Sequence, residues 1–176
     1  KTKSTTLEYA AAHKLDVICK KLHLSKSDHV IEIGSGWGGF AIYAAKNYGC
    51  KVTTTTISIE QYNYTKNKIK AMGLSKQIKV LLKDYRLLNG KYDKLVSIEM
   101  IEAVGHQFYD EYFKVISRLL KKEGDALIQA ITIKDQRYSH SIKSVDFIQK
   151  YIFPGSCIPS LTAIQNSLTN STDLVI

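Results

Sequence analysis

A cluster of glycines near residue 35 is the feature that most restricts how this chain can fold. Four glycines fall within six positions, at 34, 36, 38 and 39. They follow a short apolar run at residues 30–33 and precede an alanine-rich stretch, 40–48, which ends at Gly49. A strand, a tight loop and a helix in this order let the backbone approach a ligand, and the helix N-terminus favours negative charge. Because the spacing also satisfies GxGxxG, a dinucleotide site and a ligand-free tight turn both stay open.

Strand-like and helix-like segments alternate along most of the chain, until residue 134. The expected helices cover residues 7–22, 40–48, 58–72 and 108–120, and the expected strands cover 30–33, 52–56, 78–82, 95–98 and 126–133. This alternation predicts an α/β fold, with a mostly parallel central sheet and helices on both faces. A length of 176 residues, of which 44% are hydrophobic, fits one domain over residues 1–176.

Two polar features favour a ligand other than a dinucleotide. Glu32 precedes the glycines, in a strand that is normally apolar in dinucleotide-binding proteins. The second expected strand leads into TTTTIS at residues 53–58, which hold no acid for a ribose about 20 residues after the glycines. S-adenosylmethionine, which carries both an amino-acid part and a sulfonium, fits this order better. The alternative for Glu32 is a half-exposed carboxylate at the end of a strand.

The net charge of +9, from 25 Lys and Arg against 16 Asp and Glu, leaves several partners open. The basic residues are spread along the chain, so they fit solubility, an anionic membrane surface or nucleic acid. A nucleic-acid partner is disfavoured, because the sequence has no N/D-P-P-Y/F motif and no clustered basic stretch. No apolar run approaches the roughly 18 residues that span a bilayer, and residues 1–4 lack an apolar signal core, so we expect no export.

The three cysteines, Cys19, Cys50 and Cys157, show no CxxC spacing. An odd number without such spacing argues against a disulfide framework and against a zinc site. We therefore expect no metal, and this cysteine usage fits a reducing cytoplasm.

Four segments form a distinctive combination. They are VIEIGSGWGGF at 30–40, TISIEQ at 56–61, SIEMIEAVGH at 97–106 and KYIFPG at 150–155. A glycine loop alone is common, but these motifs in this order are not. The chain, from about residue 7 to its end, resembles the cyclopropane-fatty-acid-phospholipid synthase and mycolic acid methyltransferase family. This resemblance implies the Rossmann-like fold of class I methyltransferases.

The resemblance implies that three loops bind S-adenosylmethionine. The glycine loop would wrap the methionine part, residues 56–61 would lie along the ribose and adenine, and residues 84–86 would flank the adenine. The implied cofactor-binding residues are Glu32, Gly34, Ser35, Gly36, Trp37, Gly38, Thr56, Ile57, Ser58, Gln61, Asp84, Tyr85 and Arg86. Tyr85 stands where relatives often have Trp, and the alternative for it is a surface aromatic residue.

The resemblance also implies a catalytic group around Glu102, after the fourth expected strand. In relatives the matching Glu helps to hold a bicarbonate ion, which serves as the catalytic base. Gln129 and Ile131 complete the group; Gln129 replaces a histidine of many relatives and cannot titrate near neutral pH. The alternative for Glu102 is a carboxylate that stabilises a helix N-terminus. Glu99 is the nearest competing acid, but the family pattern keeps no acid there, so we expect its side chain to lie outside this group.

The activity implied by the resemblance is transfer of a methylene group from S-adenosylmethionine to the double bond of an unsaturated fatty acyl chain of a phospholipid. The product is a cyclopropane ring, and no metal is required. The alternatives are a small-molecule N- or C-methyltransferase of the same architecture, and a cofactor-binding domain without turnover. A phospholipid substrate implies a cytoplasmic enzyme that associates peripherally with the inner face of the membrane, and a homodimer stays open.

Relatives carry a cysteine segment before the first helix, and a tyrosine and a further cysteine well after KYIFPG. The chain begins and ends inside these limits. We therefore expect a fragment of a longer enzyme, truncated at both ends, and we expect this fragment alone to be inactive.

Overall fold

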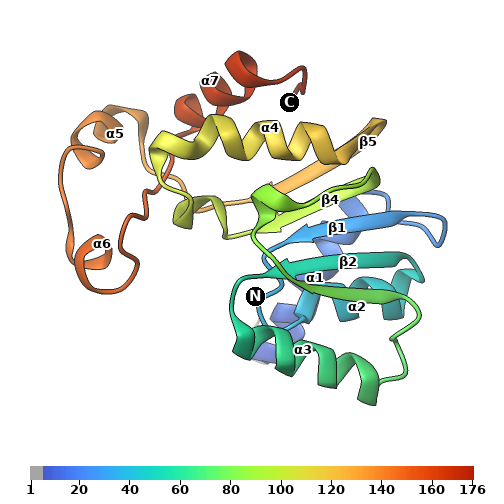
Figure 1. The fold of residues 1–176 in the computed structure, drawn as a ribbon. Helices are drawn as coiled ribbons and strands as arrows, with labels where there is room; N and C mark the ends of the chain where they lie inside the picture. The colour runs from blue at the N-terminus through green and yellow to red at the C-terminus, as the bar shows by residue number, and fades with distance from the viewer. Residues whose placement is uncertain (1–5) are drawn as a thin grey trace. The chain divides into compact units, whose positions relative to one another are not determined.

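The computed structural model describes residues 6–176, so the residues at 1–4 that lack an apolar signal core lie outside the described part. Its elements follow one another as strands and helices along the chain (Figure 1). The strands are β1 (His29–Ile33), β2 (Lys51–Thr56), β3 (Ile78–Leu82), β4 (Tyr92–Ile98) and β5 (Leu120–Gln129). The α-helices are α1 (Leu7–Lys21), α2 (Gly39–Tyr48), α3 (Ile59–Ala71), α4 (Tyr109–Leu119), α5 (Asp135–Ser141), α6 (Phe147–Tyr151) and α7 (Leu161–Ser171). Short 3₁₀ helices are η1 (Tyr85–Leu87), η2 (Ile101–Ala103) and η3 (His106–Phe108).

The five strands form one sheet in the order β3-β2-β1-β4-β5. β1 pairs in parallel with β2, which places Glu32 opposite Thr54, and β2 pairs in parallel with β3. The expectation of an α/β fold around a mostly parallel sheet is confirmed. In such a sheet, ligands bind at the carboxyl ends of the strands, near the point where the strand order reverses. Here the order reverses between β1 and β4.

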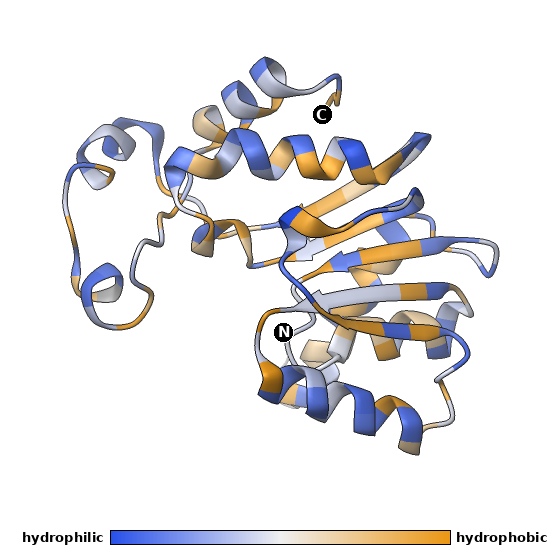
Figure 2. Ribbon diagram, in the orientation of Figure 1, coloured by the Kyte–Doolittle hydropathy of each residue, from blue (hydrophilic) through white to orange (hydrophobic). Residues whose placement is uncertain are grey.

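The chain divides into two compact units. The first contains the residues up to Val96 together with Leu120–Leu127, and the second contains Ser97–Leu119 and Ile128–Ile176. In the first unit α1 packs on α2, while α2 and α3 both contact β2 and β3. In the second unit α4 packs along α7, and hydrophobic and hydrophilic residues alternate along α4 (Figure 2).

Two expected helices differ from the structure in their burial or in their limits. On α1, Leu7 is 80% exposed, and burial is confined to the end of the helix at Ile18, Cys19 and Leu22. The expected helix over 108–120 begins one residue later, because Phe108 belongs to η3 and is 42% exposed. The buried residues of α4 are Tyr109, Tyr112, Phe113, Val115, Ile116 and Leu119.

The expected strand over 126–133 is also wrong in its limits. β5 begins at Leu120, directly after α4, and it ends at Gln129. Its first residues are polar, so they lack the apolar pattern from which a strand is predicted. Ion pairs hold them instead, between Lys121 and Asp93 at 2.7 Å and between Lys94 and Asp125. As a consequence, Gln129 is the last residue of the strand and Ile131 lies beyond it.

The helices after residue 134 carry too weak an apolar pattern to be predicted. Ser160 precedes α7 and caps it, because its hydroxyl accepts a hydrogen bond from the N–H of Ala163. Side-chain hydrogen bonds join α7 and the residues after it to α4, from Ser167 to Asp110 at 2.5 Å and from Ser117 to Asp173 at 3.1 Å. Polar contacts with α4 therefore contribute to the position of α7.

Candidate functional site

The glycine loop after β1 is anchored to β2 through the main chain. The N–H groups of Gly34 and Ser35 both donate to the carbonyl oxygen of Thr55, at 3.1 and 2.8 Å. Gly36 has φ +47°, and a Cβ added there would have no described atom within 4 Å. At Gly38, with φ +79°, an added Cβ would lie 2.7 Å from Cγ2 of Thr65 on α3. Gly36 therefore leaves open space beside the loop, whereas Gly38 allows the loop to pack closely on α3.

Glu32 is a buried carboxyl group whose side chain lacks a complete set of partners. The residue is 3% exposed, and its Oε2 atom has no hydrogen-bond partner among residues 6–176. The hydroxyl of Thr54, its neighbour on β2, is also buried and without a partner in this described range. Burial raises the pKa of Glu32 to about 8, because the charged form loses its hydration. A cationic group of a ligand would supply the missing interaction.

The segment from Thr56 to Gln61 forms a closed hydrogen-bond motif. The hydroxyl of Thr56 accepts from the N–H of Ser58 at 3.1 Å and donates to Oε1 of Gln61 at 2.7 Å. The hydroxyl of Ser58 caps α3 by accepting from the N–H of Gln61 at 3.2 Å. Since Oε1 of Gln61 is engaged, the side-chain NH₂ is the end of this amide that can donate to a ligand.

Asp84, Tyr85 and Arg86 follow β3 and form a hydrogen-bonded turn. Arg86 donates to both carboxylate oxygens of Asp84, from Nε at 3.0 Å and from a terminal nitrogen at 2.6 Å. These hydrogen bonds hold the pKa of Asp84 below its usual range. Because Asp84 and Arg86 pair with each other within the turn, their contact stabilises η1. Tyr85, which lies between them, is half-buried.

The remaining cofactor candidates are apolar residues with exposed surfaces and one buried serine. Trp37 is 56% exposed and packs edge-to-face against Tyr64, with ring centroids 5.3 Å apart. Ile57 is 80% exposed, and Ser35 is buried. All the cofactor candidates thus follow or end β1, β2 and β3, whose carboxyl ends share one edge of the sheet.

The catalytic candidates lie together in the second unit. Oε1 of Glu102 accepts a hydrogen bond from the main-chain N–H of Ile131 at 2.5 Å. Oε2 of Glu102 is buried, and the described part of the chain offers it no hydrogen-bond partner. The structure therefore unites Glu102 and Ile131, and it leaves one carboxylate oxygen for a ligand with a donor group.

Gln129 is held by Glu99 rather than by Glu102. Nε2 of Gln129 donates to Oε1 of Glu99 at 2.6 Å, and the N–H of Glu99 donates to the carbonyl oxygen of Gln129 at 2.7 Å. Glu99 has φ +51°, in the left-handed region. The expectation that Glu99 lies apart from this group is therefore corrected. No sequence pattern reveals the contact, because it depends on the ends of β4 and β5 being neighbours.

Cys157 is a second residue that the sequence does not connect to this group. Its N–H donates to the carbonyl oxygen of Glu102 at 2.8 Å, and its own carbonyl oxygen accepts from the Tyr109 hydroxyl at 2.7 Å. The thiol is buried, and all three cysteines of the described chain are free. The main chain of Cys157 therefore stabilises the turn that carries Glu102.

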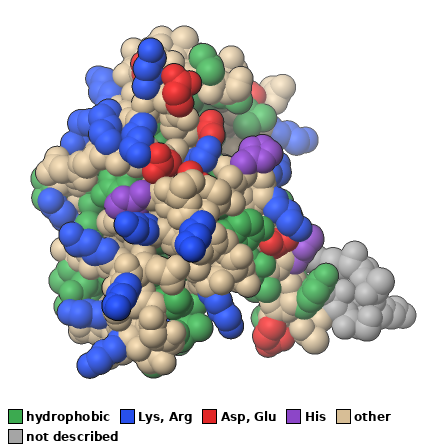
Figure 3. Space-filling model, turned by 90° about the vertical axis from the view of Figure 1, so that its right-hand side faces the viewer, with side chains coloured by type: hydrophobic (Ala, Val, Ile, Leu, Met, Phe, Trp, Pro, Cys, Tyr) green, Lys and Arg blue, Asp and Glu red, His purple; other side chains and the backbone are tan. Residues whose placement is uncertain are grey.

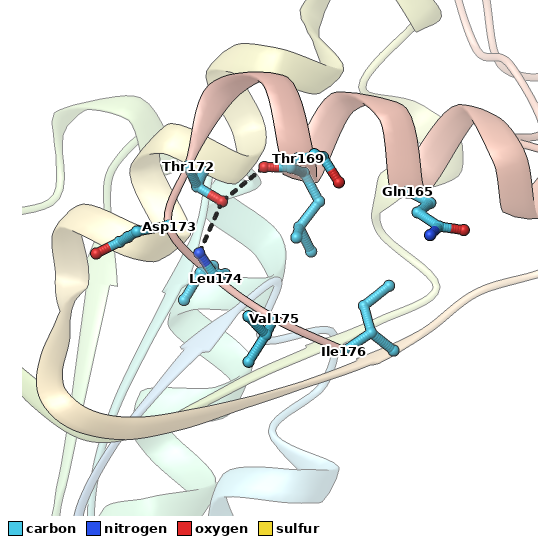
Figure 4. Close-up of a pocket in the computed structure, with 8 residues that line it drawn as sticks. Gln165, Thr169, Thr172, Asp173, Leu174, Val175 and Ile176 are labelled. Atoms are coloured by element: carbon cyan, nitrogen blue, oxygen red, sulfur yellow. Dashed lines mark hydrogen bonds between the residues drawn. The ribbon is translucent and has the colours of Figure 1, made fainter.

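A separate cavity of about 410 Å³ lies at the end of α7. Figure 4 shows its lining residues, which are Gln165, Leu168, Thr169, Thr172, Asp173, Leu174, Val175 and Ile176. Its lining includes none of the candidate residues, and the Asp173 side chain accepts a hydrogen bond from Ser117. Within the described residues, no cluster of three or more His, Cys, Asp or Glu side chains could hold a metal ion.

Glu32→Gln should flatten the pH dependence of stability in the ligand-free protein. The ordinary pKa of this carboxyl is 4.5, and the folded-state pKa is about 8. Between these values the folded state retains a proton that the unfolded state releases. The free energy of unfolding therefore falls as pH rises through this range, by up to about 1.4 kcal/mol per pH unit. Urea unfolding of both proteins between about pH 5 and pH 8 measures the difference.

Glu60→Gln is the matched control, since the Ser58 hydroxyl holds the pKa of Glu60 below its usual value and outside this range. If the free energy of unfolding changes equally with pH in the wild type and in Glu32→Gln, Glu32 is already ionised in the folded protein over this pH range.

Known proteins resemble this chain along its whole length. A family model described as Mycolic acid cyclopropane synthetase matches residues 1–176. The Escherichia coli (strain K12) cyclopropane-fatty-acyl-phospholipid synthase is 41% identical over 161 residues, which cover 92% of this chain and 40% of that protein. Tuberculostearic acid methyltransferase UfaA1 of Mycobacterium tuberculosis is 37% identical over 172 residues, which cover 98% of this chain and 40% of that protein. The chain thus spans about 40% of the length of these two relatives.

Solved structures agree with the sequence comparison. The mycolic acid cyclopropane synthase CmaA1, complexed with SAH and CTAB, matches with a TM-score of 0.85 and 27% identity over 95% of this chain and 62% of that chain. Such neighbours confirm the Rossmann-like fold of class I methyltransferases. This chain belongs to the mycolic acid cyclopropane synthetase family.

Proposed function

We propose that this chain is the S-adenosylmethionine-binding core of an enzyme that methylenates lipids. The reaction transfers a methylene group to the double bond of an unsaturated fatty acyl chain of a phospholipid and forms a cyclopropane ring. The observation that carries this proposal is 41% identity, over 92% of the chain, to a protein named cyclopropane-fatty-acyl-phospholipid synthase. The proposal concerns the whole protein of which these residues form part.

The residues after β1, β2 and β3 fit S-adenosylmethionine. When bound, this cofactor supplies an electrophilic methyl group on a sulfonium, which the π electrons of a double bond can attack. Glu32 offers a buried carboxyl group with an unpaired oxygen to the cationic part of the ligand. Gln61 offers the NH₂ end of its amide to the ribose or adenine, and Gly36 leaves room beside the loop. The related structure of CmaA1 was solved with SAH.

The group around Glu102 fits a bicarbonate ion as the catalytic base. Ring closure requires that a proton leave the newly attached methyl group. A bicarbonate ion can donate its O–H to the unpaired Oε2 of Glu102 and can accept from the amide of Gln129, while the N–H of Ile131 holds Oε1 of Glu102 in place. In this proposal these three residues hold and orient the base and do not themselves take the proton.

We also propose that the enzyme associates peripherally with the inner face of the membrane. No helix among residues 6–176 is long and apolar enough to cross a bilayer. Lys and Arg side chains are scattered over the face seen in Figure 3 and do not form one cluster. Five residues in or beside α6, however, have hydrophobic side chains that are between 51% and 74% exposed: Val145, Phe147, Tyr151, Ile152 and Phe153.

These five residues, the α6 apolar segment, fit insertion into the surface of an anionic bilayer. Aromatic and aliphatic side chains enter the boundary between headgroups and acyl chains, and nearby lysines contact anionic headgroups. Lys143 lies just before the α6 apolar segment and Lys150 lies within it, and the ammonium of Lys150 lies 5.1 Å from the centroid of the Tyr151 ring. Exposed apolar surface next to positive charge therefore favours an anionic lipid surface as its partner.

Gly36→Ala should weaken binding of S-adenosylmethionine by at least about tenfold, about 1.4 kcal/mol. The added methyl group would enter the open space that the ligand requires. Gly73→Ala is the control, because Gly73 also has positive φ and open space but follows the far end of α3. Calorimetric titration with S-adenosylmethionine or its demethylated product measures both variants. Equal affinities in the two variants, or preferential binding of NAD, would reject this cofactor site.

Glu102→Gln should reduce turnover on the order of 10²–10⁴-fold, which is typical for loss of a positioned base. Cofactor affinity should change little, because the cofactor candidates follow β1, β2 and β3. Mass spectrometry of lipids from cells that express the full-length gene should show a gain of one CH₂, and this gain should nearly vanish in the variant. Glu123→Gln, at an exposed carboxylate on β5, is the control.

Wild-type protein that binds the cofactor but adds no CH₂ would indicate a binding domain without turnover. Methylation of an added amine with no change in the lipids would indicate a small-molecule methyltransferase. A Glu102→Gln protein with normal turnover would remove Glu102 from the group that holds the base.

Binding of the full-length protein to vesicles of unsaturated phosphatidylglycerol and phosphatidylcholine should weaken as salt rises, because salt screens surface charge. The binding that persists at high salt should fall when Phe147 and Phe153 are both changed to Ser, because the inserted apolar surface is lost. Sedimentation measures the bound fraction, and Met72→Ser removes an exposed apolar side chain elsewhere as a control. Unchanged binding of the double variant would exclude the α6 apolar segment from the membrane contact.

A further inference from the structure

We propose that Glu99 is a positioning residue, which holds the side-chain amide of Gln129 in one orientation for the ligand that Glu102 also binds. This inference rests on the proposed function, since it takes Gln129 to be part of the group that holds bicarbonate. The family pattern gives Glu99 no role, and the role proposed here comes from the contacts of its side chain and main chain.

Glu99 contacts Gln129 at two points. The carboxylate of Glu99 accepts a hydrogen bond of 2.6 Å from Nε2 of Gln129. The main-chain N–H of Glu99 donates to the main-chain carbonyl oxygen of Gln129 at 2.7 Å. Three residues further along, Glu102 accepts from Ile131, two residues after Gln129. The carboxylates of Glu99 and Glu102 thus accept hydrogen bonds from residues 129 and 131. Both contacts hold the chain where β5 ends.

The backbone conformation of Glu99 indicates that its carboxylate matters. Its φ of +51° lies in the left-handed region, which residues with a Cβ avoid and glycine adopts without strain. The turn after β4 would therefore form more easily with glycine at this position. Strained residues of this kind concentrate at functional sites. The turn itself does not require a glutamate, so the feature that glutamate adds at this position is its carboxylate.

The contact decides which end of the Gln129 amide faces Glu99. A carboxylate only accepts hydrogen bonds, so the amide must turn its NH₂ toward Glu99. The carbonyl oxygen Oε1 and the second N–H are then available in a fixed arrangement, one acceptor and one donor. In the proposed arrangement the single O–H of bicarbonate donates to Glu102, so the other oxygens of the ion accept from the second N–H of Gln129. Without Glu99 the amide could rotate and exchange its acceptor for a donor.

This arrangement also gives the group a constant charge near neutral pH. A histidine at position 129 would titrate in that range, and a neighbouring carboxylate would raise the pKa of the imidazole. Glutamine does not titrate, so its hydrogen-bonding pattern is the same at every pH near neutrality. Gln129→His therefore converts the contact with Glu99 into a measurable pKa.

The test combines an activity readout with one that does not depend on activity. In the full-length enzyme, Glu99→Gly should raise the bicarbonate concentration for half-maximal activity on the order of tenfold, the effect expected when the partner that orients a ligand is removed. The affinity for the cofactor should stay unchanged. By NMR, the imidazole introduced by Gln129→His should have a pKa that falls by about one unit or more when Glu99→Gly is added.

Glu99→Ala separates positioning from stability. Both variants at 99 remove the carboxylate, but only glycine relieves the strain of the positive φ, so Glu99→Gly should have the higher melting temperature. Positioning predicts the same bicarbonate shift in both variants. Three outcomes would each overturn the inference. They are a bicarbonate requirement that differs between the two variants as their melting temperatures do, an unchanged bicarbonate requirement, and an imidazole pKa that does not depend on residue 99. If the wild-type enzyme methylenates no lipid, the proposed function fails, whereas the imidazole pKa still tests the contact.

Discussion

Parallel pairing of β1 with β2 is the constraint on which the cofactor side of this protein depends. The pairing places Glu32 opposite Thr54, and it brings the N–H groups of Gly34 and Ser35 to the carbonyl oxygen that ends this register, that of Thr55. Because this oxygen accepts both hydrogen bonds, main-chain contacts fix the start of the glycine loop. Its side of the site is therefore preorganised, which lowers the entropic cost of binding.

The catalytic candidates depend on main-chain contacts of the same kind at the ends of β4 and β5. Glu99 directly follows β4, and Gln129 is the last residue of β5. The hydrogen bonds of Glu99 and Glu102 with the segment 129–131 join these two chain ends. The turn that ends at Cys157 adds a third support, through its contacts with Glu102 and Tyr109. A substitution that shifts β5 would consequently displace both carboxylates relative to their partners.

The sequence predicts the features that arise from local pattern, and it does not predict those that arise from pairing. The glycine loop, the helix that starts near residue 58 and the first three strands follow from residue type and spacing, and the structure agrees. The start of β5 is polar, and the apolar pattern of α7 is weak. Tertiary contacts, rather than local sequence pattern, therefore determine both elements. The positive φ of Glu99 and its contact with Gln129 could not be predicted, because no residue pattern encodes a left-handed glutamate.

Each group of candidate residues contains one buried carboxylate oxygen without a described partner, on Glu32 and on Glu102. Such an atom lowers stability by about 1–3 kcal/mol relative to a satisfied one, and packing alone would favour an apolar residue. A ligand that completes the hydrogen bonding recovers this free energy, so part of the binding energy arises from relief of an unfavourable unbound state. At Glu32 the same burial keeps the carboxyl mostly protonated below about pH 8. Arrival of a cationic ligand favours the ionised form, so binding at neutral pH must release a proton, and affinity is coupled to pH through this one buried group.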